Sequence, residues 1–575
     1  MAVQWGAMLP VKIDATSNSE YAPRPIGATL ERANALAATR IVENTRRVGQ
    51  SRRGFLAGLC GAATTLWTLN EAFAARGNVG GRYNVLRDAM FEGEAAAQTL
   101  AGTEFILDAQ THLVEPNGAW RTGQSANWAA TLRGWPQAAC GEADPVACYS
   151  ADHFLKEVFL DSDTPVGVLS FVPSPPADNP LSMAEAMRAR ELVRRLDGTG
   201  RLLLQFKVMP NYPPFAAQLD SMDRAAAEWP VSAWKAYTGY GPGGRGWRLD
   251  DPAIGVPFLE RARKLGVRTI CIHKGLPFGG QDAAFATCED VGSAAKLFPD
   301  INFVLYHSGF ETGTREQAFD ARANRRGIDT LVRSLQVAGI APNANVYAEF
   351  GSTWRSLMRD PTAAAHALGK LTNAVGVDNV LWGTDSIWYG SPQDQIQAFR
   401  AFEIAPLLVD RNGYAALTPA LKAKVFWLNA ARPVQHRPEC CEEARRGRRY
   451  RRAEAGVCGS AVAVVRDIRA ADHARVPRVP ISGRRPARSR VASGAAYRPP
   501  RAAAAATGGA DCSAGRARCG PGWRCSTPTG RGRWADCGAA AAAGRLAPAA
   551  AACRSSSARC RCGRRPSDAG RRGGR

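Results

Sequence analysis

Short apolar, β-rich runs alternate with helix-like segments from Glu104 to Arg432, and this pattern most constrains the fold of the chain. Strands that alternate with helices form parallel sheets, so eight such units predict a (β/α)8 TIM barrel. A doubly wound open sheet is the alternative, but no Gly-rich phosphate loop follows the first run. The eight predicted strands are 105–112, 166–173, 202–210, 231–239, 268–275, 301–309, 345–353 and 379–386.

Polar residues occur where several of these strands end, which is the edge that carries chemistry in such barrels. The first strand ends in DAQTH, where Gln110 and His112 share a face because side chains two residues apart point the same way. Three of the seven histidines lie at strand ends, namely His112, His273 and His307, and the eighth strand ends in Asp385. A lone buried histidine is usually structural, but three of them at one rim with a carboxylate predict a functional site.

Imidazoles and a carboxylate at one barrel mouth suit Zn²⁺ or a similar divalent ion with an open coordination position. Such an ion lowers the pKa of its bound water and polarises a carbonyl, while a nearby His or Asp moves the proton. The residues alone therefore predict metal-assisted chemistry on a small molecule.

Four motifs, DAQTH, CIHKGLP, LYHSG and LWGTDS, together resemble the metal-dependent amidohydrolase superfamily. The similarity is closest to its amidohydrolase-2 branch, which includes the aminocarboxymuconate-semialdehyde decarboxylase-like enzymes, and it covers residues 104–432. The resemblance implies that His112, His273 and Asp385 are metal ligands. It also implies that His307 acts as the catalytic acid or base, and Asp385 could share the proton transfer.

Gln110 departs from the family pattern, because the family has the first histidine of an HxH pair at this position. The amide oxygen is neutral and a poorer donor than imidazole, so metal affinity should fall or shift toward harder ions. A metal-free pocket is the other outcome. Lys235 on the fourth strand is open to two interpretations, since a carboxylated lysine there bridges two metals in some members. A substrate-facing or structural lysine is the favoured one.

The resulting hypothesis is a zinc-dependent hydrolase of a small amide, ester or lactone that uses metal-activated water. The first alternative is a non-oxidative decarboxylase of a small carboxylic acid at the same residues. An alternative from another class is a degenerate barrel that only binds its ligand, which the substitution at Gln110 suggests.

Residues 51–75 have the order of a twin-arginine export signal, with Arg52 and Arg53, then an apolar stretch, then Ala72-Phe73-Ala74. The apolar stretch is shorter than the roughly 20 residues of a spanning helix, so we expect no stable membrane span. We expect export to the periplasm through the twin-arginine machinery, with an uncleaved anchor or a buried helix as alternatives. Residues 1–50 are predicted to be a disordered extension, and residues 76–432 the barrel domain.

Residues 433–575 differ in composition from everything before them. They hold 31 arginines, no lysine and nine acidic residues, and thus nearly all of the net charge of +23. No apolar period is present, so this tail is predicted to be disordered. A GC-rich gene read out of frame yields such a composition, and we favour that frameshift origin. A genuine disordered tail and a nucleic-acid-binding arm are the alternatives, and we expect no nucleic-acid partner.

The cysteines follow the same division, with ten of the fifteen in the tail. In the body, Cys140 and Cys148 could form a disulfide in an oxidising compartment.

Overall fold

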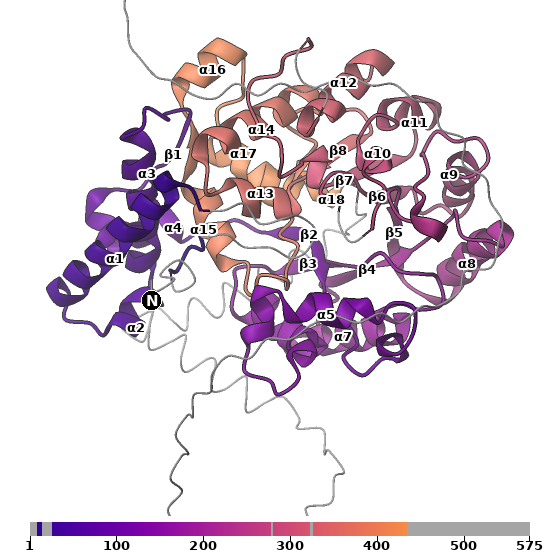
Figure 1. The fold of residues 1–575 in the computed structure, drawn as a ribbon, viewed down its shortest axis with the longest axis horizontal. Coiled ribbons are helices and arrows are strands. Elements are labelled where there is room, and N and C mark those ends of the chain that lie inside the picture. The colour runs from indigo at the N-terminus through magenta and orange to yellow at the C-terminus, as the bar shows by residue number, and fades with distance from the viewer. Residues whose placement is uncertain (1–8, 14–25, 278–279, 323–325, 434–575) are drawn as a thin grey trace, which may run out of the picture. The chain divides into compact units, whose positions relative to one another are not determined.

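Eight parallel strands, hydrogen-bonded in chain order, form the centre of the computed structural model, which describes residues 9–13, 26–277, 280–322 and 326–433 (Figure 1). Each lies in one of the predicted runs, so the (β/α)8 prediction is confirmed. The predicted tail lies outside the described residues, apart from Pro433. The strands are β2 (Leu107–His112), β3 (Val166–Ser170), β4 (Leu202–Lys207), β5 (Val231–Tyr237), β6 (Thr269–His273), β7 (Asn302–Tyr306), β8 (Val346–Glu349) and β9 (Val380–Leu381).

The barrel closes between β2 and the segment that follows β9. The backbone N–H of Asp385 donates to the carbonyl of Gln110 at 2.9 Å, and the N–H of His112 donates to the carbonyl of Ser386 at 2.6 Å. These bonds satisfy backbone groups that an open sheet would leave at its edges. They also place the ends of the first and eighth strands side by side.

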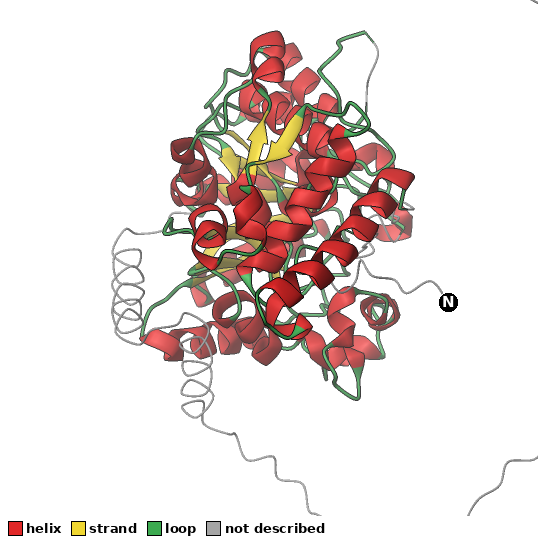
Figure 2. Ribbon diagram, turned by 90° about the vertical axis from the view of Figure 1, so that its left-hand side faces the viewer, coloured by secondary structure: helices red, strands yellow, loops and turns green. Residues whose placement is uncertain are grey.

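Helices surround the strands on the outside of the barrel (Figure 2). Helix α7 (Met183–Asp197) shows how the sequence sets their ends: the Ser182 side chain accepts from the N–H of Glu185, and Gly198 ends the helix with φ 82°. The other α-helices that follow β2 are α5 (Asn127–Arg133), α6 (Ala151–Phe154), α8 (Phe215–Glu228), α9 (Gly255–Lys264), α10 (Ala283–Ala286), α11 (Val291–Leu297), α12 (Ile328–Ala338), α13 (Gly351–Leu357), α14 (Pro361–Ala374), α15 (Gln393–Ala401), α16 (Pro406–Asn412), α17 (Pro419–Ala423) and α18 (Asn429–Ala431).

Two smaller features complete the body. Strand β1 (Gly81–Tyr83) pairs antiparallel with β10 (Phe402–Ile404), which ties the N-terminal part of the chain to the end of the barrel. Cys140 and Cys148 form the predicted disulfide, with their Cα atoms 5.8 Å apart.

Residues 28–47, which lie within the predicted disordered extension of residues 1–50, form a helix, so the prediction of disorder is wrong for this stretch. Helix α1 (Ala28–Arg47) contacts α3 (Leu59–Ala74), and both lie with α2 (Arg52–Leu56) and α4 (Gly93–Leu100) on one side of the barrel (Figure 1, indigo). The reason is a narrow apolar stripe on α1 at helical spacing, half of it alanine: the buried Leu30, Ala33, Ala37 and Ile41. Among residues 1–50, the structure describes 9–13 and 26–50.

The predicted export signal coincides with α2 and α3, and most of α3 is buried, including Leu66, Leu69 and Ala72. The structure therefore places this segment as a buried helix, one of the two alternatives to a signal, and export remains an untested prediction. Within the described ranges, no helix combines the length and apolarity that crossing a membrane requires.

If α3 is an integral part of the core, Leu66→Ala should lower the free energy of unfolding by about 2–5 kcal/mol, because it leaves a cavity at a fully buried site. The matched control is Leu297→Ala on α11, where the leucine is 57% exposed and the expected change is within about 0.5 kcal/mol. Denaturant unfolding of the two variants measures both values. Equal, small effects would show that α3 is only loosely attached.

Candidate active site

The structure brings all five predicted site residues to the carboxyl end of the barrel. Gln110 and His112 lie in the last half of β2, and His273 ends β6. His307 begins a short 3-10 turn after β7, and Asp385 follows β9. Each side chain is at most 1% exposed. The sequence therefore identified side chains that share one buried region.

The amide of Gln110 lies at the centre of this group. Its Nε2 is 3.0 Å from Asp385 Oδ1, 3.3 Å from His112 Nε2 and 3.4 Å from His307 Nε2. Its Oε1 has no hydrogen-bond partner among the described residues. A half-turn of a carboxamide exchanges its NH2 and its oxygen. The same side chain can therefore donate its two hydrogens to two of these three atoms or place an oxygen among them.

The predicted ligand His273 lies at the edge of this group. Its Nε2 is 3.3 Å from the carbonyl oxygen of Leu276, and its ring centroid is 4.6 Å from that of His307. The ring thus packs beside His307, with its Nε2 directed at the backbone of the loop that follows β6.

The histidines and Asp385 do not on their own make a three-ligand metal site. Within the described ranges, only one set of three His, Cys, Asp or Glu residues has its ligand atoms mutually within 4.8 Å, and it is Cys140, Glu142 and His153. Cys140 of that set is bonded to Cys148. A metal at the barrel mouth therefore depends on the residue at position 110.

With Gln110 included, the mouth does fit a divalent ion. His112 Nε2 is 3.0 Å from Asp385 Oδ1, and these two atoms form a triangle with edges of 3.0–3.3 Å with Gln110 Nε2, the position that Oε1 takes after a half-turn of the amide. Ligand atoms about 2.1 Å from one ion lie about 3.0–3.4 Å apart, which matches these edges. One imidazole nitrogen and two oxygens suit Mn²⁺ or Mg²⁺ better than Zn²⁺.

The three imidazoles of the site are held neutral. Burial lowers the pKa of His112, lowers that of His273 well below the usual value, and lowers that of His307 to about 3. The positive charge of Lys235 lowers all three further, and its Nζ lies 3.8 Å from the ring centroid of Tyr306. Each ring therefore keeps one nitrogen that can accept a proton.

Two buried carboxyl groups near the site hold the backbone in place. Burial raises the pKa of Asp108 to about 7 and that of Glu349 well above its usual value. Asp108 Oδ1 accepts from the N–H groups of Gln110 at 3.1 Å and Thr384 at 3.0 Å, so it joins the two sides of the barrel closure. Glu349 Oε2 accepts from the N–H of His307 at 3.2 Å.

Side chains outside the five predicted site residues complete the surroundings of Asp385 and His112. Ser352, on α13, donates to Asp385 Oδ2, and its Oγ is 2.8 Å from the hydroxyl of Tyr389. The ring of His112 stacks on Trp388, with 4.9 Å between centroids. In the sequence, only position points to these residues. Ser352 lies three residues after Glu349, and Trp388 and Tyr389 follow the LWGTDS motif.

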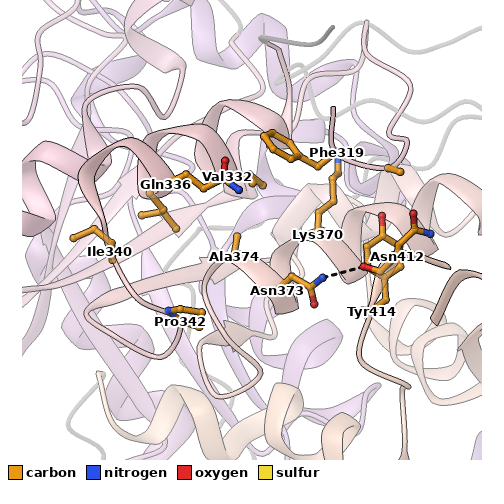
Figure 3. Close-up of a pocket in the computed structure, with 12 residues that line it drawn as sticks. Phe319, Val332, Gln336, Ile340, Pro342, Lys370, Asn373, Ala374, Asn412 and Tyr414 are labelled. Atoms are coloured by element: carbon orange, nitrogen blue, oxygen red, sulfur yellow. Dashed lines mark hydrogen bonds between the residues drawn. The ribbon is translucent and has the colours of Figure 1, made fainter. Parts of the chain in front are cut away.

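A separate cavity of about 480 Å³ lies on the outside of the barrel, between α12 and α14 (Figure 3). Phe319, Val332 and Tyr414 contribute to its lining, and none of the five predicted site residues does. Lys370, also in the lining, is paired with Glu316 and lies 2.6 Å from Asp329, as expected for a structural ion pair. This cavity is unconnected with the chemistry at the barrel mouth.

The low pKa of His307, about 3, has a measurable consequence for stability. Below pH ~6.5, the ordinary pKa of histidine, this side chain is protonated in the unfolded chain but stays neutral in the native site. The contribution of His307 to the free energy of unfolding therefore falls as the pH falls from ~6.5 to ~3. The raised pKa of Asp108 acts in the opposite direction, so a variant is needed to isolate the histidine.

We expect wild type to lose stability relative to His307→Asn across this window, as measured by denaturant unfolding at a series of pH values. Parallel curves for the two proteins would show that His307 is not held neutral.

Comparison with known proteins gives one family match. Residues 163–433 match a family model described as Amidohydrolase, a segment that begins just before β3 and so leaves out β2. No curated protein matches the chain.

Three solved structures illustrate the likeness. An uncharacterised TIM-barrel protein of Bordetella bronchiseptica is 13% identical, with a TM-score of 0.38 over 57% of this chain and 98% of its own. A dihydroxybenzoic acid decarboxylase of a Polaromonas species, solved with manganese, is 15% identical, with a TM-score of 0.34 over 59% and 99%. A 5-carboxyvanillate decarboxylase of Novosphingobium aromaticivorans, also with manganese, is 13% identical, with a TM-score of 0.36 over 58% and 96%. By the family match, residues 163–433 of this chain are similar to the amidohydrolase family.

Proposed function

We propose that this barrel is a metal-assisted enzyme that removes the carboxyl group of a small carboxylic acid without oxidation. The observation that supports this most is the charge of the site: Lys235 is fully buried beside three imidazoles whose pKa values are lowered by burial. With Asp385 bound to the metal ion, the ammonium of Lys235 is a positive group that can pair with an anionic ligand, and a carboxylate is the simplest one.

Gln110, His112 and Asp385 would hold the ion, and their two oxygens and one nitrogen favour Mn²⁺. When bound, a divalent ion supplies positive charge to an oxygen of the substrate and helps to orient it. The amide of Gln110 must then present its oxygen, which is the atom that has no hydrogen-bond partner among the described residues.

His307 and Asp385 would carry out the proton transfer that the reaction requires. Loss of CO2 breaks a carbon–carbon bond and leaves the electron pair on carbon, which must take up a proton. The neutral ring of His307 can take the proton of the acid form of the substrate and return it to that carbon, so that the acid RCOOH gives RH and CO2. Its low pKa, about 3, makes the protonated ring a strong donor. Asp385, whose other oxygen accepts from Ser352, would share the transfer.

Hydrolysis, the first hypothesis from the sequence, is the less favoured reaction. It needs a strongly activated water, and an ion bound by one imidazole, one carboxylate and one neutral amide activates water less than zinc among several histidines.

The direct test is CO2 release by the purified full chain with Mn²⁺, using a panel of hydroxybenzoic and aliphatic carboxylic acids. Lys235→Met should lower kcat/KM on an active acid about 100-fold, and His307→Asn should lower kcat by about 10²–10⁴-fold. Lys424→Met is the control, because Lys424 pairs with Asp378 on the surface at 2.6 Å. Ester or lactone hydrolysis without CO2 release would contradict the proposal, and tight binding without turnover would favour the binding-protein alternative.

Gln110→His tests the metal assignment. The variant supplies the imidazole of the family pattern, so we expect its affinity for Zn²⁺ to rise on the order of tenfold or more relative to Mn²⁺. Competition titration against a chelator measures both ions without any activity assay. Unchanged affinities for both ions would show that position 110 is not a ligand position.

A further inference from the structure

A segment from the far N-terminus of the chain, Leu9–Ile13, packs beside the loop that follows Asp385. The side chains of Val11 and Ile13 are fully buried. The backbone N–H of Lys12 donates to Asp394 Oδ2 at 3.2 Å, and its carbonyl accepts from Arg355 Nη1 at 2.7 Å. Both backbone groups of Lys12 are thus engaged by the barrel, more than 300 residues away in sequence.

The side chain of Lys12 reaches closer to the active site. Its ammonium donates to the carbonyl of Tyr389. The hydroxyl of Tyr389 lies 2.8 Å from Ser352 Oγ, and Ser352 donates to Asp385 Oδ2. A continuous series of hydrogen-bonded residues therefore runs from Lys12 through Tyr389 and Ser352 to Asp385.

Two buried charged residues, Arg355 and Asp394, also contact the region around Lys12 and Tyr389. Arg355, 1% exposed, lies 3.4 Å from Asp394, and its guanidinium carbon is 5.4 Å from the ring centroid of Tyr389. Lys12 and Arg355 are both positively charged. Asp394 is the acidic residue that contacts both of them. Removal of the segment would leave Asp394 and Arg355 with fewer partners in a buried setting, which is costly.

Asp385 needs such support, because its backbone is in an unfavourable conformation. Its φ is 60°, in the left-handed region that costs a non-glycine residue about 1–2 kcal/mol. A backbone conformation of this kind persists only where several surrounding contacts hold it in place. The N–H of Asp385 is held by Gln110, and its carboxylate is held by Ser352, Gln110 and His112.

We propose that Leu9–Ile13 is a positioning element of the active site, in which Lys12 acts through Tyr389 and Ser352 to fix the carboxylate of Asp385. The effect on catalysis rests on the proposed function, whereas the effect on the order of the loop does not. A chain that begins after residue 13 would keep all eight strands and lose this support.

The test compares Lys12→Met, Lys12→Arg and the surface control Lys424→Met in the full chain. Hydrogen exchange is measured at the amides of Asp385 and Gly390, which donate to Gln110 and Ile387 at 2.9 and 3.0 Å. Lys12→Met should raise their exchange on the order of tenfold, and Lys12→Arg should restore most of the protection. Amides of β4 and the Lys424→Met protein should show no change.

Mn²⁺ titration of the same variants is the second readout. The affinity of Lys12→Met should be about 10-fold weaker, and that of Ser352→Ala weaker still, because second-layer partners of a ligand typically matter by 10–100-fold. Unchanged exchange at Asp385 and Gly390 in Lys12→Met would overturn the inference. If exchange rises but wild type itself binds no Mn²⁺, the positioning role stands and the proposed metal function fails.

Discussion

The pairing of β2 with the segment after β9 closes the barrel and assembles the site with the same set of bonds. The backbone of Gln110 accepts from Asp385, and the side chain of Asp108 accepts from N–H groups on both sides of the closure. Gln110 and Asp385 are 275 residues apart in sequence, and only this closure makes them neighbours. The contacts of Gln110 and His112 with Asp385 depend on it, so fold stability and site geometry are coupled.

The closure also explains the electrostatics of the site. The residues it joins lie inside the barrel, where side chains are at most 1% exposed and charge is costly. The histidines therefore stay neutral. The Gln110 amide contacts three polar atoms of the site without adding charge. Lys235 and Asp385 are the charged groups that an incoming ligand would meet. This arrangement favours an anionic substrate and a hard ion rather than zinc.

Much of this could be predicted from the sequence, because the strands are apolar runs and their carboxyl ends meet at one rim by topology. That logic located Gln110, His112, His273, His307 and Asp385 together. It could not show that the Nε2 of His273 faces the carbonyl of Leu276, since the direction of a ring depends on the loop beside it. It also could not find Lys12, whose contact with Tyr389 spans 377 residues and belongs to no motif. Helix α1 was not predicted because its buried apolar stripe is narrow and half of it is alanine, which gives a weak apolar signal.

The central claim is that Gln110 is a metal ligand through its amide oxygen rather than a vestige of a lost site. Anomalous diffraction from crystals of the full chain soaked in Mn²⁺ tests it most directly. We predict one anomalous peak in contact with Gln110 Oε1, His112 Nε2 and a carboxylate oxygen of Asp385. A fully occupied ion bound by His273 and His307 away from Gln110, or no peak at the barrel mouth at saturating Mn²⁺, would contradict the account.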